Sequence, residues 1–146
     1  MKHKVIAIIP AKGISYRIVG KNLMEIRGKP MVQYTIEAAL NSSFIDRILV
    51  VTGNLEIAAL AVSIGEAIEI VNEPEHLITR KRTMEDVIHH VFENASSIDD
   101  DDIIIILQPT SPFRTAYHID AAVSMYIENM YCLLYTSDAA DELDGV

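Results

Sequence analysis

Short, almost wholly apolar segments recur along the chain. They cover residues 5–9, 47–51, 67–71 and 103–107, of which the third is the weakest and the fourth is the strongest. Apolar runs of this length, without polar alternation, are typical of strands that are buried on both faces of a parallel sheet. The pattern therefore predicts four parallel strands.

The segments between and after these strands carry apolar residues at helical spacing. The apolar faces consist of Val32, Ile36, Ala39 and Leu40; of Ile57, Leu60, Ala61 and Ile64; of Met84, Val87, Ile88, Val91 and Phe92; and of Ile119, Ala122, Val123 and Tyr126. Thr115 can cap the last helix, and Met24, Met31 and Met84 are expected to fill the core. Strands that alternate with helices predict an α/β fold, a Rossmann-like three-layer sandwich with a mostly parallel sheet.

A chain of 146 residues, 50% of them hydrophobic, suits one globular domain rather than two. Residues 132–146 show no helical or strand period, and most of them resemble the translation of an adapter used in sequencing libraries. We therefore predict a domain over residues 1–131, incomplete at its C-terminus, and a non-native tail over residues 132–146. A native C-terminal tail is the alternative.

The charge balance narrows the range of partners. Twelve Lys and Arg residues face 21 Asp and Glu residues, and the formal net charge of -9 argues against a nucleic-acid or anionic membrane surface. No apolar run is long enough to cross a bilayer, and no export signal is visible. The single cysteine, Cys132, excludes an intramolecular disulfide framework and a thiolate metal cluster, so we expect a reducing cytoplasm.

A basic, glycine-containing stretch, residues 10–22, follows the first predicted strand. It holds Lys12, Gly13, Arg17, Gly20 and Lys21. Glycines let backbone amides converge on an anion, and the cations neutralise it, so the stretch is a candidate phosphate cradle. The spacing fits neither a Walker loop nor a dinucleotide fingerprint. A basic surface loop is the alternative interpretation.

A second polar loop, residues 107–115, follows the strongest predicted strand. Gln108, Thr110 and Ser111 supply an amide and two hydroxyls that can read a nucleobase or a sugar, and Arg114 can pair with a phosphate or a carboxylate. A rigid strand-to-helix turn is the alternative. Because ligands of open parallel sheets bind beyond the carboxyl ends of the strands, we expect both loops at the same edge.

These loops, taken together with other motifs, resemble those of the acylneuraminate cytidylyltransferases. The matching motifs are Ile-Pro-Ala-Lys-Gly at 9–13, Gly-Lys-Asn-Leu at 20–23, Gly-Lys-Pro at 28–30, Tyr-Thr-Ile-Glu-Ala-Ala at 34–39 and Leu-Gln-Pro-Thr-Ser-Pro-Phe-Arg-Thr at 107–115. The resemblance implies a nucleotidyltransferase-type fold and transfer of CMP from CTP to a nonulosonic (sialic-type) acid, with release of pyrophosphate. It also implies Mg²⁺ as cofactor and a homodimer at full length. The alternatives are a nucleotidyltransferase for another sugar acid and a non-catalytic nucleotide-binding module.

The resemblance also assigns roles to individual residues. Nucleotide binding falls to Ala11, Lys12, Gly13, Ser15, Lys21, Asn22, Gln108, Thr110 and Ser111; substrate binding to Gln108 and Arg114; and the catalytic neutralisation of phosphate charge to Lys12, Arg17 and Lys21. The metal ligands of the family lie further along the chain, so no metal ligand is expected here. We therefore expect that this chain by itself does not turn over substrate.

The chain departs from the family pattern at several positions. Lys12 stands where the family usually has Arg, and Glu73 stands where many members have an Arg that contacts the nucleotide. Residues 80–84 form a basic run in place of an Asp-Thr-x-Ser-Ser stretch. Either Arg80 or Arg82 could offer its charge to phosphate, or the run is a solvated start of a helix.

Two other polar groups are interpreted as structural. The consecutive acids at residues 99–102 precede a buried strand, and we expect a solvated turn rather than a cation site. His89 and His90 lie late in a helical pattern without a third ligand at suitable spacing, so we expect them to pack or to face solvent.

Overall fold

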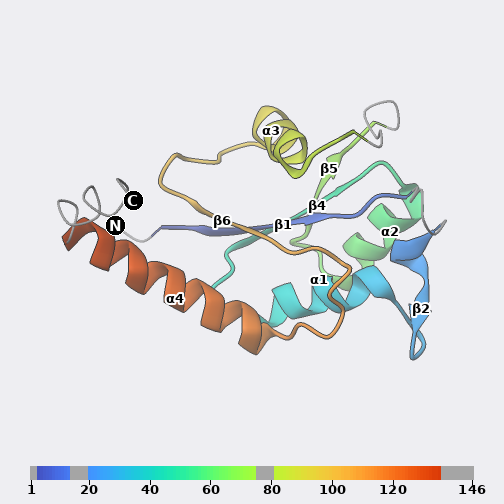
Figure 1. Cartoon of the computed structure of the whole chain (residues 1–146). Coiled ribbons are helices and arrows are strands. Elements are labelled where there is room, and N and C mark those ends of the chain that lie inside the picture. The colour runs from blue at the N-terminus through green and yellow to red at the C-terminus, as the bar shows by residue number, and fades with distance from the viewer. Residues whose placement is uncertain (1–2, 14–19, 75–80, 136–146) are drawn as a thin grey trace.

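The computed structural model of the chain describes residues 3–13, 20–74 and 81–135, excepting the side chains of residues 131–135. Within these residues, a parallel sheet has the strand order β5-β4-β1-β6 (Figure 1). Its strands are β1 (Val5–Pro10), β4 (Arg47–Thr52), β5 (Glu69–Asn72) and β6 (Ile103–Ile106). The four predicted strands are therefore confirmed.

Helices cover both faces of this sheet. They are α1 (Met31–Asn41), α2 (Leu55–Ile64), α3 (Met84–Asn94) and α4 (Ala116–Tyr135). Figure 1 shows α3 on one face and α1, α2 and α4 on the other, so the three-layer α/β sandwich is confirmed. No helix of the described residues is long and apolar enough to cross a membrane.

Helix α4 extends further than the sequence pattern indicated. It continues past residue 131 to Tyr135, so residues 132–135, for which no helical period was expected, belong to the helix. The helix begins directly after Thr115, as predicted, and the Thr115 carbonyl accepts the N–H of Ile119 at 3.2 Å, but the Thr115 hydroxyl lies 3.1 Å from Nδ1 of His118 and not against a helix N–H. The Thr115 N–H donates to Nδ1 of His118 at 3.0 Å, so the histidine ring accepts the hydrogen bond at this helix start.

The sheet separates two apolar clusters, and the alternation along β1 explains why the strand is apolar throughout. Ile6 and Ile8 pack with residues of α3, whereas Val5, Ala7 and Ile9 pack with α1, α2 and α4. All five are buried. A strand that is covered on both faces has no solvent-facing position, and the unbroken apolar run follows from this.

Some residues that were predicted to lie in the core are exposed. Leu40, Phe92, Ala122 and Tyr126 lie on their predicted helices but are exposed to solvent. Each helix contacts the sheet through a narrow stripe, and these four residues lie at its rim, next to buried positions such as Val91. Met24, which directly follows η1 (Lys21–Leu23), is exposed as well. The prediction was therefore wrong for these five residues, whereas Met31 is buried and Met84 packs against the α3-side cluster.

A small hairpin that the sequence pattern did not predict precedes α1. It pairs β2 (Glu25–Ile26) with β3 (Lys29–Pro30). The turn residues Arg27 and Gly28 have φ values of 52° and 81°, which places both in the left-handed region of a two-residue hairpin turn. Strands of two residues are too short to show any period, so this hairpin could not be read from the hydrophobic pattern.

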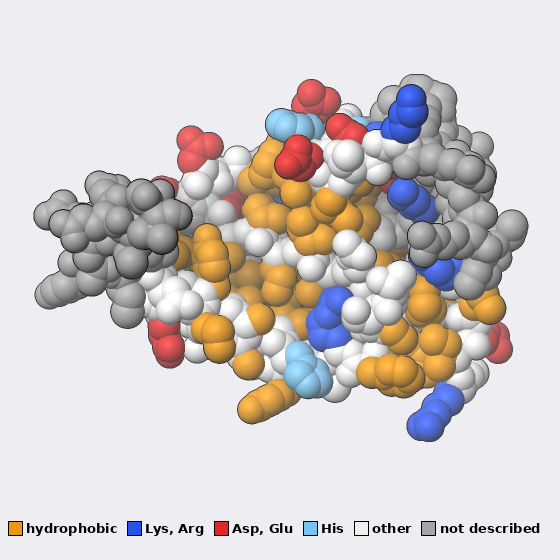
Figure 2. Space-filling model, viewed as in Figure 1, with side chains coloured by type: hydrophobic (Ala, Val, Ile, Leu, Met, Phe, Trp, Pro, Cys, Tyr) orange, Lys and Arg blue, Asp and Glu red, His pale blue; other side chains and the backbone are white. Residues whose placement is uncertain are grey.

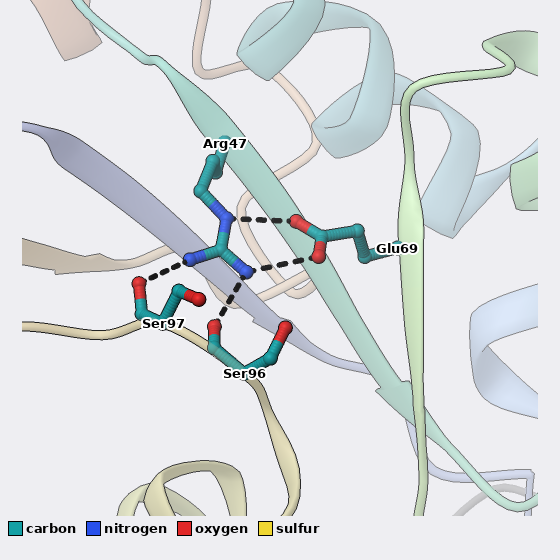
Figure 3. A network of polar contacts seen from close by, with 4 residues as sticks. All are labelled: Arg47, Glu69, Ser96 and Ser97. Carbon is teal, nitrogen blue, oxygen red and sulfur yellow. Dashed lines mark hydrogen bonds and ion pairs between the residues drawn. The ribbon is translucent and has the colours of Figure 1, made fainter.

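An ion-pair network stabilises the amino end of the sheet (Figure 3). Nε and Nη2 of Arg47 each donate to a carboxylate oxygen of Glu69 at 2.9 Å. The same guanidinium donates to the carbonyls of Ser96 and Ser97 at 3.0 and 2.9 Å. The hydrogen bonds that Arg47 donates to Glu69 raise the pKa of Arg47, and the network links β4, β5 and the segment after α3.

A carboxylate on α4 holds the turn after α1. Asp120 accepts from the Ser42 hydroxyl at 2.5 Å and from the Ser43 N–H at 3.1 Å. These hydrogen bonds lower the pKa of Asp120 below its ordinary value of 3.8, and the bond from the Ser42 hydroxyl has the largest effect. A carboxylate whose pKa is lower in the folded state than in the unfolded state stabilises the fold at pH values above its unfolded pKa. This contribution is lost as the pH falls through the folded-state pKa.

We therefore expect Asp120→Asn to reduce the acid sensitivity of the fold. At pH 7 the variant should lose about 1 kcal/mol of unfolding free energy, and this difference should shrink as the pH falls below about 4. Urea denaturation at several pH values measures both quantities. Asp100→Asn, in the exposed turn before β6, is the control. A loss for Asp120→Asn that is independent of pH would contradict the assignment.

Candidate functional site

Backbone hydrogen bonds place the segments after the strands along one edge of the sheet. Ala11 donates to the carbonyl of Val51 at 2.9 Å, and Glu73 donates to that of Thr52 at 3.1 Å. On the other side of β1, Leu107 donates to a β1 carbonyl at 2.9 Å. The two predicted loops are therefore neighbours at the carboxyl ends of β1 and β6. Ala11 is wholly buried and its N–H is used within the sheet, so that N–H is not available to bind a phosphate.

The start of the first loop rests on the beginning of α2. Asn54 caps this helix, because its Oδ1 accepts the N–H groups of Glu56 and Ile57 at 2.9 and 3.1 Å. A Cβ built on Gly13 would lie 2.6 Å from Cβ and 2.7 Å from Nδ2 of Asn54. Only glycine permits this approach, and the loop is thereby held close to the positive end of the α2 dipole.

Asn22 joins the two described ends of the first loop. It lies in a short 3-10 helix, η1 (Lys21–Leu23), which begins after Gly20 in the left-handed conformation. Its buried side-chain amide donates to the carbonyl of Lys12 at 2.7 Å. The amide group is therefore occupied in positioning the loop, and the backbone of Lys21 is brought next to Lys12.

The remaining candidates of the first loop, Ser15 and Arg17, lie outside the described residues. Lys12, Gly13 and Lys21 are partly exposed at this edge. Figure 2 shows most of the Lys and Arg side chains visible from this side gathered towards the end of the molecule where β4 and β5 finish. The cations visible on this face therefore lie mainly at that end of a chain whose net charge is -9.

The second loop consists of two successive turns. The Ser111 N–H donates to the carbonyl of Gln108 at 3.3 Å, and the Arg114 N–H donates to that of Ser111 at 3.2 Å. Pro109 is buried, whereas Gln108, Thr110 and Ser111 are exposed. The loop thus presents an amide and two hydroxyls to solvent at the sheet edge.

Arg114, near the end of this loop, makes only part of the hydrogen bonds that its guanidinium group could donate. Its Nη2 donates to the carbonyl of Gln108 at 3.2 Å, but its Nη1 is buried without a hydrogen-bond partner among the described residues. Burial lowers the pKa of Arg114. A guanidinium nitrogen that is buried without a hydrogen-bond partner or counter-charge is unfavourable, so this arrangement favours an anion as ligand.

A buried ion pair stands at the same edge, next to β4. Nε of Arg82 contacts Oε1 of Glu73, and the two side chains are 7% and 1% exposed. Both interpretations of the basic run were therefore wrong for Arg82: it is neither a solvated residue nor a cation open to phosphate. Arg80 lies outside the described residues. Positions 73 and 82 have no periodic relation, so no sequence signal indicated the pair.

The described acids and histidines give no metal centre. Among the described residues, no group of three His, Cys, Asp or Glu side chains could hold a metal ion. The Asp99 N–H donates to Oδ2 of Asp102 at 2.9 Å, which confirms the predicted turn. His90 places Nε2 2.7 Å from the carbonyl of Asn72, so it packs α3 against the end of β5, as expected.

The fold is thus a parallel α/β sandwich of the nucleotidyltransferase type, with two polar loops at the carboxyl edge of its sheet. Comparison with solved structures agrees with this fold. A structure titled CMP:2-keto-3-deoxy-manno-octonic acid synthetase complexed with CTP superimposes with a TM-score of 0.66 at 22% identity, over 86% of this chain and 48% of the other. A cytidylyltransferase from Leptospira borgpetersenii superimposes with a TM-score of 0.64.

The chain belongs to the cytidylyltransferase family, whose sequence profile matches residues 6–144. An N-acylneuraminate cytidylyltransferase from Escherichia coli O18:K1:H7 is 38% identical over 92% of this chain and 31% of its own length. The CMP-N,N'-diacetyllegionaminic acid synthase of Legionella pneumophila is 37% identical over 84% of this chain and 53% of its own length. The chain thus spans about a third to a half of these relatives.

Proposed function

We propose that this chain supplies the nucleotide-binding part of an enzyme that transfers CMP from CTP to a nonulosonic acid. The observation that carries the proposal is the juxtaposition of the Lys12–Gly13 and Gln108–Arg114 segments at the carboxyl ends of β1 and β6. The membership of the family and the names of the relatives support the choice of CTP and a sugar acid.

In the proposed reaction, a hydroxyl oxygen of the sugar acid forms a bond to the α-phosphorus of CTP. The bond from that phosphorus to the bridging oxygen breaks, pyrophosphate leaves, and the hydroxyl proton is released. The protein's contribution is positioning and neutralisation of charge. Lys12 and Lys21, with Arg17, face the phosphates in this proposal, and the α2 amino end adds its partial positive charge.

In this proposal, the second loop binds the base of the nucleotide and the sugar acid. Gln108, Thr110 and Ser111 offer exposed hydrogen-bonding groups to the base or the sugar. Arg114 pairs through Nη1 with an anionic oxygen, which we assign to the carboxylate of the sugar acid or to a phosphate. Gly13 and Asn22 act by positioning the backbone around Lys12.

Magnesium is the cofactor that we propose for the complete enzyme, because it neutralises triphosphate charge. The described acids do not fit a site for this ion: Glu73 is paired with Arg82, and Asp120 is bound to Ser42. A homodimer and the cytoplasm, the latter inferred from the single cysteine, remain our proposed assembly and compartment.

Nucleotide binding by the 146-residue chain tests the proposal. We expect CTP to bind at least about tenfold more tightly than ATP, since the exposed groups of the second loop distinguish bases by their hydrogen-bonding edges. Isothermal titration with CTP, UTP, GTP and ATP, each with and without Mg²⁺, measures this preference. Equal affinity for all four nucleotides would contradict the cytidylyl assignment, and no binding would contradict nucleotide binding altogether.

A further inference from the structure

The outer edge of β6 is an apolar surface that the proposed nucleotide site does not use. β6 stands last in the strand order β5-β4-β1-β6, and among the described residues it pairs with β1 alone. We propose that this edge binds a second copy of the chain, through antiparallel pairing of β6 with β6 of that copy. The proposal assigns a surface to the homodimer named above and does not depend on nucleotide binding.

The backbone of β6 directs hydrogen-bonding groups outward along this edge. The N–H groups of Ile103 and Leu107 donate to carbonyls on the β1 side at 2.8 and 2.9 Å. Successive residues of a strand direct their backbone groups to opposite sides, so Ile104 and Ile106 direct their N–H and C=O groups away from β1. Such a row of groups on an apolar strand is a template for another strand.

Apolar side chains flank this edge on both faces of the sheet. On α3, His90 hydrogen-bonds to the end of β5, and Phe92 lies about 200° further around the helix, on the opposite flank. On α4, Asp120 binds the turn after α1, and Ala122 lies on the opposite flank in the same way, with Tyr126 one turn later. Figure 2, seen from the β6 side, shows hydrophobic side chains between α3 and α4.

The amount of apolar surface suits a small dimer interface. Residues 104–106 are partly exposed between the two flanks, and Phe92 and Tyr126 are 48% and 54% exposed. An aromatic side chain buries about 150–250 Å² when it is covered, so these residues offer on the order of 400 Å² per copy. With backbone and rim atoms, two copies together reach the roughly 1,000 Å² that a specific interface needs. We therefore expect a dissociation constant in the micromolar range.

A second copy fits this edge because the pairing is self-complementary. An antiparallel pair centred on Ile105 places Ile104 opposite Ile106 of the second copy, and Ile106 opposite its Ile104. The outward N–H groups of both copies then each meet an outward carbonyl. The two-fold axis also keeps the acidic turns at residues 99–102 at opposite ends of the paired strands, where they do not repel each other. Both β6 edges are then covered, so the assembly stops at two copies.

Sedimentation velocity of the 146-residue chain over a range of concentrations tests the proposal. Ile104→Pro removes an outward N–H, and proline is tolerated at a strand edge where that N–H faces solvent. Ile104→Ala is the matched control, because it also shortens the side chain but keeps the N–H. We expect Ile104→Pro to dimerise at least about tenfold more weakly than Ile104→Ala, since each dimer loses the hydrogen bond at both copies.

Two tyrosines of α4 provide a second comparison that leaves the strand intact. Tyr126→Glu places a charge on the flank beside β6, whereas Tyr117, which is 78% exposed, lies on the opposite side of the helix. We expect Tyr126→Glu to weaken dimerisation at least about tenfold and Tyr117→Glu to leave it within about twofold. Thermal unfolding shows whether each variant folds, and if Ile104→Pro does not, the tyrosine pair decides by itself.

Three outcomes would overturn the proposal. They are a chain that stays monomeric at about 100 μM, growth beyond the dimer, and equal dimerisation of the two folded variants within either pair. Failure to dimerise would leave the proposed function standing, because the two candidate loops lie at the carboxyl ends of β1 and β6 and not along this edge. Failure to bind CTP would in turn leave the dimer standing.

Discussion

Arg114→Met is expected to weaken binding of the anionic ligand by about 2–4 kcal/mol while leaving the fold as stable as before, or slightly more stable. Truncation of one partner of a desolvated charge pair commonly costs this much affinity. The free protein, however, holds Nη1 of Arg114 buried without a hydrogen-bond partner among its described residues. Removal of that charge relieves a desolvation penalty that exists only while no ligand is bound.

The opposite signs of the two effects make this prediction specific. Urea denaturation gives the unfolding free energy, and titration with CTP and with nonulosonic acids gives the affinities. Arg27→Met is a matched control, because it removes the same charge from the exposed turn of the β2–β3 hairpin. A variant at position 114 that loses stability but retains its affinity would show that Arg114 only supports the turn.

Gly13→Ala is expected to have the largest effect on the first loop. The new Cβ would lie 2.6 Å from Cβ of Asn54, and neither of these atoms is at the end of a flexible chain. Either the loop must move or Asn54 must leave its cap on α2. We expect a loss of about 2–3 kcal/mol of unfolding free energy, together with loss of nucleotide binding, since overpacking and loss of a cap act at the same place.

A double-mutant cycle with Asn54→Gly tests this explanation. Glycine is tolerated at the N-cap of a helix at a cost of only a few tenths of a kcal/mol, and it removes the three atoms that lie nearest to the new Cβ. The double variant should therefore be nearly as stable as Asn54→Gly alone. Gly65→Ala is the control, because its Cβ would meet only side-chain ends of Ile68 and Leu40 at 3.3 Å. Additive losses in the cycle would exclude the clash.

The order of elements and the placement of the two candidate loops at one edge of the sheet could be predicted from the sequence because they depend on burial and on topology. A strand that is covered on both faces must be apolar throughout, as β1 is, and this pattern is visible in one dimension. Parallel strands direct their carboxyl ends to one edge, so the loops after β1 and β6 had to be neighbours. The family motifs in these loops then indicated the cytidylyltransferase family, and the family match over residues 6–144 confirms it.

Only the tertiary structure decided how individual side chains are used. The Glu73–Arg82 pair, the contact between Gly13 and Asn54 and the buried Nη1 of Arg114 each depend on segments that are distant in the sequence or on atoms of a single turn. Hydrophobic periodicity does not predict such contacts, because the sequence does not show whether a charged side chain is solvated or buried. The sequence alone thus determined the sheet, its helices and the edge at which ligands are expected, whereas packing decided which charges at that edge are open to a ligand and which are already paired.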